Sequence, residues 1–570
     1  ANLTVGAWRL GETGIAATGS AGATAITADA VVTTLVREAT VGRLSILDAP
    51  VASTFRLEAD RKAHVWSFFS DPAECLRMPH GRFRLAGQDS EAELTGARLC
   101  RNEAPLLVWR GGDNPHAEVK GRLTASAGSY RIGLTRLDGL PPTVDLEAQY
   151  DPRAQLTEVA GTMENGVVIV NGAIAATDAR GTFSGRLDRA ALSGEAALSR
   201  VTLAQNVKAP QLAPITATGT ARLAAEKVDF NYSAATERGL PIGGGAGVHD
   251  VRRGVGRTTF RSGALVFAPR GLQPADIVSA LKGIVSGAAG SASGEASFVW
   301  GRRPSDFRSS GAFAIGDLAF LGPGRAVNRT DGVSGKIVLT SLSPLKSDGE
   351  QTLTVKGVDM DALKLEQGSI RYALPGDGTV RISAATFPWF GGRIGAYDST
   401  AALTGAAIDT ALKAEDVDLG LLLDHLKIEG LSGEGVVEGT LPLKIVEGRA
   451  RVVDGFFTAK GPGVIRYVGK AGDAAGSANK QARFAFDILR DLHFDELTAR
   501  IDGPLDGDLN FNIVFKGANE VTVDERKVTS PVIYRISLEA PLLALIDQAR
   551  ISSDIKLQIE RAGGTIEESE

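Results

Sequence analysis

Apolar residues at every second position, in short runs broken by turn residues, dominate this chain of 570 residues. From Leu509 to Phe515, Leu, Phe, Ile and Phe alternate with Asn, Asn and Val. Side chains of a strand point alternately to its two faces, so this pattern predicts sheets with one apolar and one polar face. Few segments have helical periodicity, so the central question is what covers the apolar face.

Composition and charge exclude several classes of protein. The net charge of −5 gives no reason to expect a nucleic-acid partner. No apolar run reaches the roughly 18 residues that a membrane-spanning helix needs. The 68 glycines suit many tight turns and close strand contacts. The run Gly243–Gly247 resembles an anion-binding loop superficially, but it predicts a loop or bulge.

The two cysteines, Cys75 and Cys100, allow one disulfide bond. An even count fits a disulfide in an oxidising compartment, and two buried free thiols are the alternative. Both cysteines lie in an irregular stretch between Ala63 and Arg110, which we interpret as a strand-rich insert.

The chain divides into four parts by pattern. We expect an N-terminal β segment with the cysteine insert at 1–110, a central β region at 111–330, a further β region at 331–520, and a helix with edge strands at 521–570. Strand-like runs recur about every 8–14 residues, as in all-β folds. Helices are expected at the following segments: Gln273–Ile284, Asp359–Leu365, Glu415–Leu426 and Ala540–Arg550.

The sequence offers no motif that would carry chemistry. It lacks the nucleophile elbow, the zinc-protease pattern and the phosphate loop, and its six histidines have no ligand spacing. We therefore assign no catalytic residue, metal ligand or cofactor, and expect a protein that is not an enzyme.

The C-terminal part carries a family resemblance. Residues 448–463 read G-R-A-R-V-V-D-G-F-F-T-A-K-G-P-G, after an acidic-led helix at Leu419–Leu423, a Gly430–Gly433 loop and a strand at Leu441–Leu443. This arrangement resembles the C-terminal region of the YdbH family, formerly labelled a dicarboxylate-transport domain and related to the AsmA-like proteins that include TamB. The similarity is strong over roughly the last 250 residues.

The resemblance implies a periplasmic bridge that carries phospholipids between the inner and outer membranes. Members are anchored in the inner membrane by one N-terminal helix, which we expect upstream of Ala1. They form an elongated, curled β-sheet with a continuous hydrophobic groove and a few short helices, and the C-terminal end is thought to meet a small outer-membrane lipoprotein. No nucleic acid is expected.

If apolar strand faces hold lipid, alternating apolar residues of the C-terminal half are the candidate groove. These are Ile337, Leu339, Leu353, Val355, Val380, Ile382, Phe484, Phe486, Ile488, Leu509, Phe511, Ile513 and Phe515. The alternative is that they pack into an ordinary sandwich core, and a shift of one residue in register would turn them all to the other face.

A terminal strand with a free edge is a docking site for another strand. We expect the partner edge at Ile555, Leu557 and Ile559.

The alternative function is a secreted β-solenoid, either an adhesin or a polysaccharide-active protein. A parallel solenoid favours a regular coil period, which this sequence does not have.

Overall fold

The structure is a computed structural model of the whole chain. It describes residues 3–5, 8–41, 44–70, 75–85, 90–102, 104–132, 135–170, 172, 174–189, 191–208, 210, 212–283, 285–301, 303–322, 327–360, 363–403, 410–426, 429–446, 449–468, 488–505, 507–523, 526–541 and 556–561. The chain forms two compact units. Unit 1 contains Ala1–Gly263, Asp276–Ser279 and Gly294–Ser310, and unit 2 contains Ala264–Ala275, Ala280–Ser293 and Gly311–Glu570.

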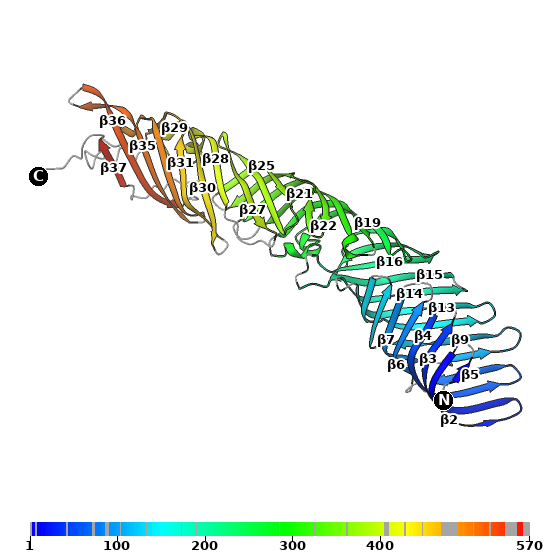
Figure 1. Cartoon of the computed structure of the whole chain (residues 1–570). Coiled ribbons are helices and arrows are strands. Elements are labelled where there is room, and N and C mark those ends of the chain that lie inside the picture. Colours follow the sequence, from blue (N-terminus) through cyan, green and yellow to red (C-terminus); the bar gives the residue numbers. More distant parts are fainter. Residues whose placement is uncertain are drawn as a thin grey trace. The chain divides into compact units, whose positions relative to one another are not determined.

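Unit 1 is built from antiparallel strands, drawn from blue to green in Figure 1. From β12 to β19 each strand pairs with the next one along the chain. The strands are β1 (Leu3–Val5), β2 (Trp8–Ala21), β3 (Ala25–Val41), β4 (Leu44–Asp60), β5 (Val65–Ser70), β6 (Leu76–Leu85), β7 (Ser90–Cys100), β8 (Leu107–Arg110), β9 (His116–Thr124), β10 (Ala127–Ile132), β11 (Thr135–Leu140), β12 (Thr143–Asp151), β13 (Leu156–Val170), β14 (Ile174–Asp188), β15 (Ala191–Gln205), β16 (Ile215–Ala224), β17 (Lys227–Thr236), β18 (Pro241–Asp250) and β19 (Val255–Phe267).

The region that holds the cysteines interrupts this simple order. Strand β4 pairs with both β5 and β6, and β7 pairs with β6, β9 and β10. A disulfide bond joins Cys75, just before β6, to Cys100 at the end of β7. It links two strands that are already paired side by side.

Unit 2 continues with antiparallel strands, drawn from green to red in Figure 1. Strands β19 and β20 contribute residues to both units. The remaining strands are β20 (Ser286–Trp300), β21 (Arg308–Leu321), β22 (Arg329–Leu342), β23 (Leu345–Ser347), β24 (Gln351–Met360), β25 (Leu363–Ala373), β26 (Thr379–Trp389), β27 (Gly392–Ala402), β28 (Thr410–Asp418), β30 (Val436–Val446), β31 (Arg449–Ala459), β34 (Glu496–Pro504), β35 (Asp508–Val523), β36 (Arg526–Pro541) and β37 (Lys556–Arg561), with β29 (Leu431–Glu434), β32 (Gly463–Tyr467) and β33 (Leu492–Phe494) in a separate three-stranded sheet.

The expected fold class, a mostly β protein with antiparallel sheets and few short helices, is confirmed. The antiparallel register of the strand pairs also differs from the parallel coils of the β-solenoid considered above. Alternation predicted the sheet correctly because period two is a direct consequence of strand geometry.

The helix expectations were mostly wrong. Helix α1 spans only Leu419–Leu426, because Glu415 to Asp418 end strand β28, where Val417 pairs with Val437. The side chain of Asp418 then caps the helix by accepting a hydrogen bond from the backbone N–H of Leu421, at 3.0 Å.

Two other expected helices are replaced by 3₁₀ turns and by strands. The segment from Gln273 forms two short 3₁₀ turns, Pro274–Asp276 and Ser279–Leu281. The Gln273 side chain bonds the backbone N–H and C=O of Ala288 in β20, which ties this segment to the strand. The Asp359–Leu365 segment contains the end of β24 and the start of β25. In the fourth segment, Ala540 and Pro541 end β36, and residues 542–550 lie outside the described residues.

Unit 2 has a closed apolar core. Ala414, Val417, Val437, Phe457, Leu497, Phe515 and Tyr534 come from the apolar face of the large sheet, and they pack against Leu419 of α1, Ile465 of β32 and Phe494 of β33. The rings of Phe494 and Phe515 lie 5.7 Å apart. Helix α1 and the three-stranded sheet therefore cover this part of the apolar face.

A second apolar core cluster contains residues of β22, β24–β28, β30 and β31. It includes Val355, Phe387, Ile394 and Leu412, and Ile394 has no exposed surface. Both clusters are filled with protein side chains, as close packing of a stable core requires.

The closed core makes a stability prediction. Ile394→Ala leaves a cavity and should lower the free energy of unfolding of unit 2 by about 2–5 kcal/mol. Leu421→Ala removes a side chain that is 49% exposed and should change that free energy by less than about 0.5 kcal/mol. Urea unfolding of both variants measures this difference. Equal effects would contradict a packed core around Ile394.

Candidate functional site

One row of register partners crosses unit 1 from β4 to β19 on a single face. Directly paired residues of antiparallel strands place their side chains on the same side of a sheet. The row is Leu57, Phe68, Leu107, Val119, Ala148, Val159, Gly185, Gly194, Leu223, Val228, His249 and Gly256. Apart from His249, every member is apolar or glycine.

Neighbouring rows on the same side are equally apolar. Leu146 pairs with Gly161, which pairs with Phe183. Tyr232 pairs with Gly219 and Gly245. We call this side of β9 and β12–β19 the apolar face; its large side chains are Val119, Leu123, Val144, Leu146, Tyr150, Val159, Met163, Phe183, Leu187, Leu198, Leu223, Val228, Phe230, Tyr232 and Phe260.

The apolar face is only partly covered. The large side chains named above have intermediate exposure. Leu192, which pairs with Leu187 on this face, is 40% exposed, whereas Val201, which pairs with Ala217, is buried. Among the described residues from 116 to 263, the buried apolar residues are Val201, Ala217, Ala234 and Ile242. Apolar surface of this kind marks a place where an apolar partner binds. In unit 2, α1 and the three-stranded sheet cover the apolar side of β28, β30, β31 and β34–β36.

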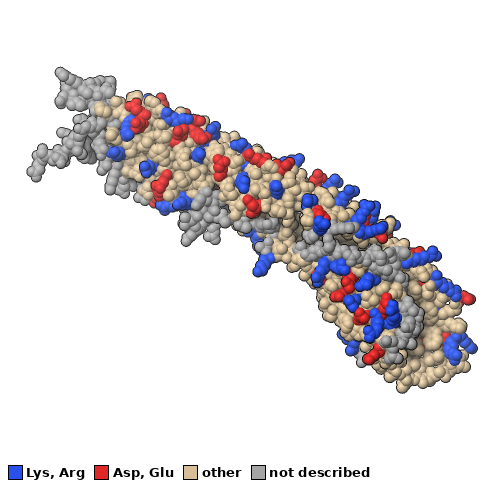
Figure 2. Space-filling model, viewed as in Figure 1, with Lys and Arg blue, Asp and Glu red and all other residues tan. Residues whose placement is uncertain are grey.

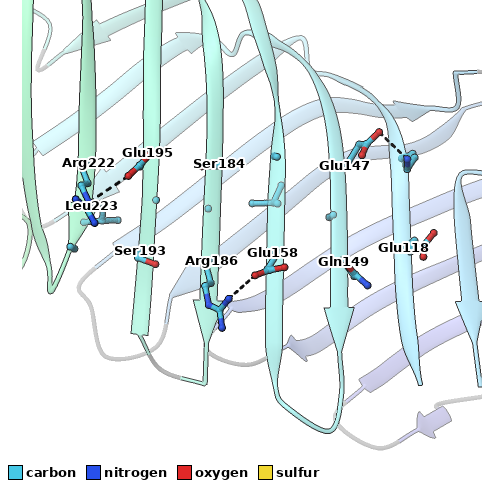
Figure 3. Close-up of a pocket in the computed structure, with 17 residues that line it drawn as sticks. Glu118, Glu147, Gln149, Glu158, Ser184, Arg186, Ser193, Glu195, Arg222 and Leu223 are labelled. Atoms are coloured by element: carbon cyan, nitrogen blue, oxygen red, sulfur yellow. Dashed lines mark hydrogen bonds and ion pairs between the residues drawn. The ribbon is translucent and has the colours of Figure 1, made fainter. Parts of the chain in front are cut away.

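The opposite side of the same strands is charged. Lys120 pairs with Glu147 at 2.9 Å, Arg186 with Glu158 at 2.7 Å, and Arg222 with Glu195 at 3.5 Å. Figure 3 shows these ion pairs crossing between neighbouring strands. Figure 2 shows that basic and acidic side chains also lie close together on much of the surface in view. We call the charged side of β9 and β12–β19 the polar face.

Ion pairs of the polar face contribute little stability each because they are exposed. Their main effect is to keep that side of the sheet hydrated and to favour one pairing register of the strands. Arg122 is the best example, since its Nε and Nη2 donate to the two carboxylate oxygens of Asp145 at 2.8 and 2.7 Å. These hydrogen bonds hold the pKa of Asp145 below its ordinary value.

A shallow hollow of about 640 Å³ lies on the polar face, lined by Glu118, Lys120, Glu158, Arg186 and Glu195 among others. Figure 3 shows these side chains on adjacent strands. Charges of both signs line it, so acyl chains would have to displace water from exposed ions there. The apolar face, and not this hollow, is therefore the candidate site.

The candidate groove residues predicted from the sequence all belong to unit 2. Leu339, Val355, Ile488, Leu509 and Phe515 are buried, with 2–6% exposure. Ile337, Leu353, Val380, Ile382, Phe511 and Ile513 are partly exposed. Phe484 and Phe486 lie outside the described residues.

Register places the four residues of β35 on one face, through the pairs Leu509–Ala540, Phe511–Ile501, Ile513–Ala499 and Phe515–Leu497. Phe515 lies in the core cluster with Ile488, and Ile513 packs against that cluster. Contact of this set with lipid stays a prediction.

The apolar face of unit 1 was not among the predicted site residues. Its signal is the same alternation, as in Gly181, Phe183, Gly185 and Leu187. Glycine at positions on the apolar face weakens the alternating pattern in the sequence, because the large side chain that covers each glycine comes from the neighbouring strand.

The predicted partner edge lies in the last described strand. Leu557 pairs with Ile536, and Ile559 pairs with Tyr534, so β37 is bonded to β36. Among the described strand pairs, β37 has this one neighbour. Ile555 lies outside the described residues.

His249 is the one imidazole in the row that defines the apolar face. Trp300 donates its Nε1–H to Nδ1 of His249 at 3.1 Å, and the two rings stack with centroids 6.0 Å apart. Burial lowers the pKa of His249, and the charge of Asp250 and a backbone hydrogen bond with Val255 oppose that shift.

An antiparallel sheet with a charged side and a partly exposed apolar side is typical of proteins that bind an apolar partner on that side. A sequence model of the family described as YdbH-like, intermembrane phospholipid transport protein YdbH, matches residues 23–563. The chain therefore belongs to the YdbH-like family of intermembrane phospholipid transport proteins.

A comparison with curated proteins finds no match. None of the helices in the described part of the chain has the length and apolar character needed to cross a bilayer. The family assignment thus rests on the sequence model, which covers nearly the whole chain.

The His249 environment makes a pH prediction. Because the folded pKa lies below the unfolded value of about 6.5, the unfolded chain takes up the proton first. The free energy of unfolding of unit 1 should therefore be highest above about pH 6.5 and fall as the pH drops towards 5. Protonation of Nδ1 also removes the acceptor for Trp300.

His249→Gln keeps an acceptor for Trp300 but does not titrate in this range. Its unfolding free energy should fall less between about pH 7 and 5 than that of the parent protein. Denaturant unfolding at several pH values measures both slopes, and identical slopes would show that His249 does not carry this dependence.

Proposed function

We propose that the apolar face of unit 1 holds the acyl chains of phospholipids while their headgroups stay in water, and that the chain carries these lipids across the periplasm as a bridge between inner and outer membranes. The supporting observation is that the large side chains of this face remain partly exposed among the described residues. The family assignment identifies the cargo class as phospholipid.

The energetics suit this role. Each methylene group removed from water gains about 0.8 kcal/mol, so a long acyl chain binds an apolar face without a specific pocket. The partly exposed residues of unit 2, including Leu353, Ile382 and Ile513, extend the proposed lipid path within that unit. The buried residues Val355 and Phe515 instead fill its core.

The location of the protein follows from the same proposal. Lipid exchange between two membranes needs one end near the inner membrane, and we propose that an N-terminal helix anchors the protein there, as the family resemblance implies. The periplasm is also an oxidising compartment, where the disulfide between Cys75 and Cys100 persists.

A partner at the C-terminal end completes the proposed bridge. Strand β37 is paired on one side by β36, and an unpaired edge accepts an added strand through main-chain hydrogen bonds. We propose that a small outer-membrane lipoprotein adds a strand to β37, as the family resemblance implies.

A matched pair of substitutions tests the lipid face. Phe183 lies on the apolar face and is partly exposed, and its neighbour Ser184 lies on the polar face and is exposed. Phe183→Arg should lower the phospholipid that co-purifies with the full chain by about tenfold, because acyl chains would bury an unpaired guanidinium. Ser184→Arg should leave it unchanged.

Lipid extraction and mass spectrometry measure the phospholipid bound per protein in each variant. A parent protein that neither retains nor exchanges phospholipid would refute the proposed function. An equal loss of bound phospholipid in both variants would show that the lipid does not bind at Phe183 on the apolar face.

Truncation tests the partner edge. Removing residues 553–570 deletes β37 and should abolish capture of the lipoprotein while the remaining sheet stays folded. The shorter removal of 562–570 keeps β37 and should retain capture. Pull-down from solubilised outer membranes compares the two truncations, with circular dichroism as the folding control. Unchanged capture by the chain that lacks residues 553–570 would refute a docking site at β37.

A further inference from the structure

Strand β18 contains the glycine run Gly243–Gly247, which the sequence alone predicted to be a loop or bulge. In the structure the run lies inside a strand, paired with β17 on one side and β19 on the other, with a register shift at its start, where Ala234 pairs with Gly243 and Ala235 with Pro241. The predicted irregularity is therefore found at Gly243, and the rest of the run is regular strand. Gly243, Gly245 and Gly247 lie on the apolar face, since their partners include Ala234, Tyr232 and Phe230. Glycine inside a strand lowers stability, so three on one face require an explanation.

Aromatic rings from the neighbouring strands occupy the space over these glycines. A Cβ atom added to Gly247 would lie 2.4 Å from Cζ of Phe230. One added to Gly245 would lie 2.8 Å from the hydroxyl oxygen of Tyr232, and closer still to the backbone oxygen of Thr259. One added to Gly243 would lie 2.8 Å from Cζ of Phe260 and closer still to the backbone oxygen of Arg261, and the φ of +144° at Gly243 favours glycine by itself. Each ring therefore leans across the sheet onto a glycine of the adjacent strand.

Trp300 of β20 makes the same contact on β19. The three atoms nearest to an added Cβ on Gly256 all belong to the Trp300 ring, the closest being Cζ2 at 2.3 Å. We call these four pairs the aromatic floor: Phe230 over Gly247, Tyr232 over Gly245, Phe260 over Gly243 and Trp300 over Gly256.

Hydrogen bonds and ring contacts hold the floor in place. Trp300 donates to His249, and the Tyr232 hydroxyl donates to the backbone oxygen of Thr259 at 3.4 Å. The rings of Phe230 and Tyr232 stack with centroids 6.3 Å apart and planes 27° apart. These contacts fix where the rings lie over the neighbouring strands.

We propose that Gly243, Gly245, Gly247 and Gly256 are positioning residues that let the aromatic rings lie across the adjacent strand, and so set the clearance above the apolar face through which a phospholipid acyl chain passes. This inference rests on the proposed function. An upright ring would project into the space that an acyl chain needs, whereas a ring that leans over a glycine of the adjacent strand leaves that space open. The glycines act on lipid through the rings.

A purely structural role is the competing explanation. Rings that cover glycines also shield the backbone and compensate for the missing side chains. That role predicts that a side chain at Gly256 changes stability alone. The positioning role predicts in addition a loss of lipid contact that disappears when the displaced ring is removed.

Gly256 and Trp300 give the clearest experiment, because no backbone atom is among the three nearest to the added Cβ. Gly263 is the matched control: it lies in the same strand β19, is exposed, and has open space where a Cβ would go. A photoreactive amino acid at Val228, whose position is in the same row as Gly256, reports acyl contact. The full chain is incubated with vesicles of phosphatidylethanolamine and phosphatidylglycerol, illuminated, and analysed for lipid adducts.

Gly256→Val should reduce the adduct about tenfold, the effect of losing the burial of about two methylene groups. Gly263→Val should leave it unchanged. The double variant Gly256→Val with Trp300→Ala should recover the parent yield, because the new side chain then occupies the space of the absent ring. Thermal unfolding of each variant separates this effect from loss of fold.

Several results would overturn the inference. Equal adduct yields for Gly256→Val and Gly263→Val would do so, and so would a double variant as low as Gly256→Val. If Gly256→Val does not fold, the smaller Gly256→Ala replaces it, because its Cβ alone meets the Trp300 ring. Its adduct should then be lower than that of Gly263→Ala, and equal yields contradict the proposal. No adduct in the parent chain refutes the proposed function itself.

Discussion

Cross-strand register is the constraint on which the rest of the structure depends. Directly paired residues share a face, so each strand must place its apolar and charged residues in phase with both neighbours. Unit 1 keeps this phase from β4 to β19, with Lys120 opposite Glu147 on one side and Val119 opposite Ala148 on the other. If one strand shifted by one residue against its neighbour, its charged side chains would lie on the apolar face. The ion pairs therefore act chiefly by favouring the observed register.

The two units use the same strand pattern with different outcomes. In unit 2, α1, β32 and β33 supply the second layer that an apolar sheet face normally requires. In unit 1, the large side chains of the apolar face stay partly exposed among the described residues. Packing accounts for the buried residues of unit 2, whereas the partly exposed face of unit 1 is where we propose that phospholipid, the cargo of the family, binds.

Strand period and turn residues predicted the sheet well, down to the shared face of Leu509, Phe511, Ile513 and Phe515. The sequence did not predict which unit leaves its apolar face uncovered, because that depends on a layer contributed by distant residues such as Phe494. Asp418 also misled the helix prediction, since its carboxylate caps α1 from the end of a strand. The run at Gly243–Gly247 looks like a loop because the rings that complete it belong to other strands.

Uniformity of the apolar face has a consequence for the proposed transport. A deep pocket would trap an acyl chain, since every methylene group that leaves it loses about 0.8 kcal/mol. On equivalent rows, a chain that advances by one strand spacing of about 4.8 Å uncovers as much surface behind it as it covers in front. The barrier then depends on local roughness. Upright Phe230 or Trp300 rings would add such roughness, and a glycine beneath each ring is the smallest change in the sheet that removes it.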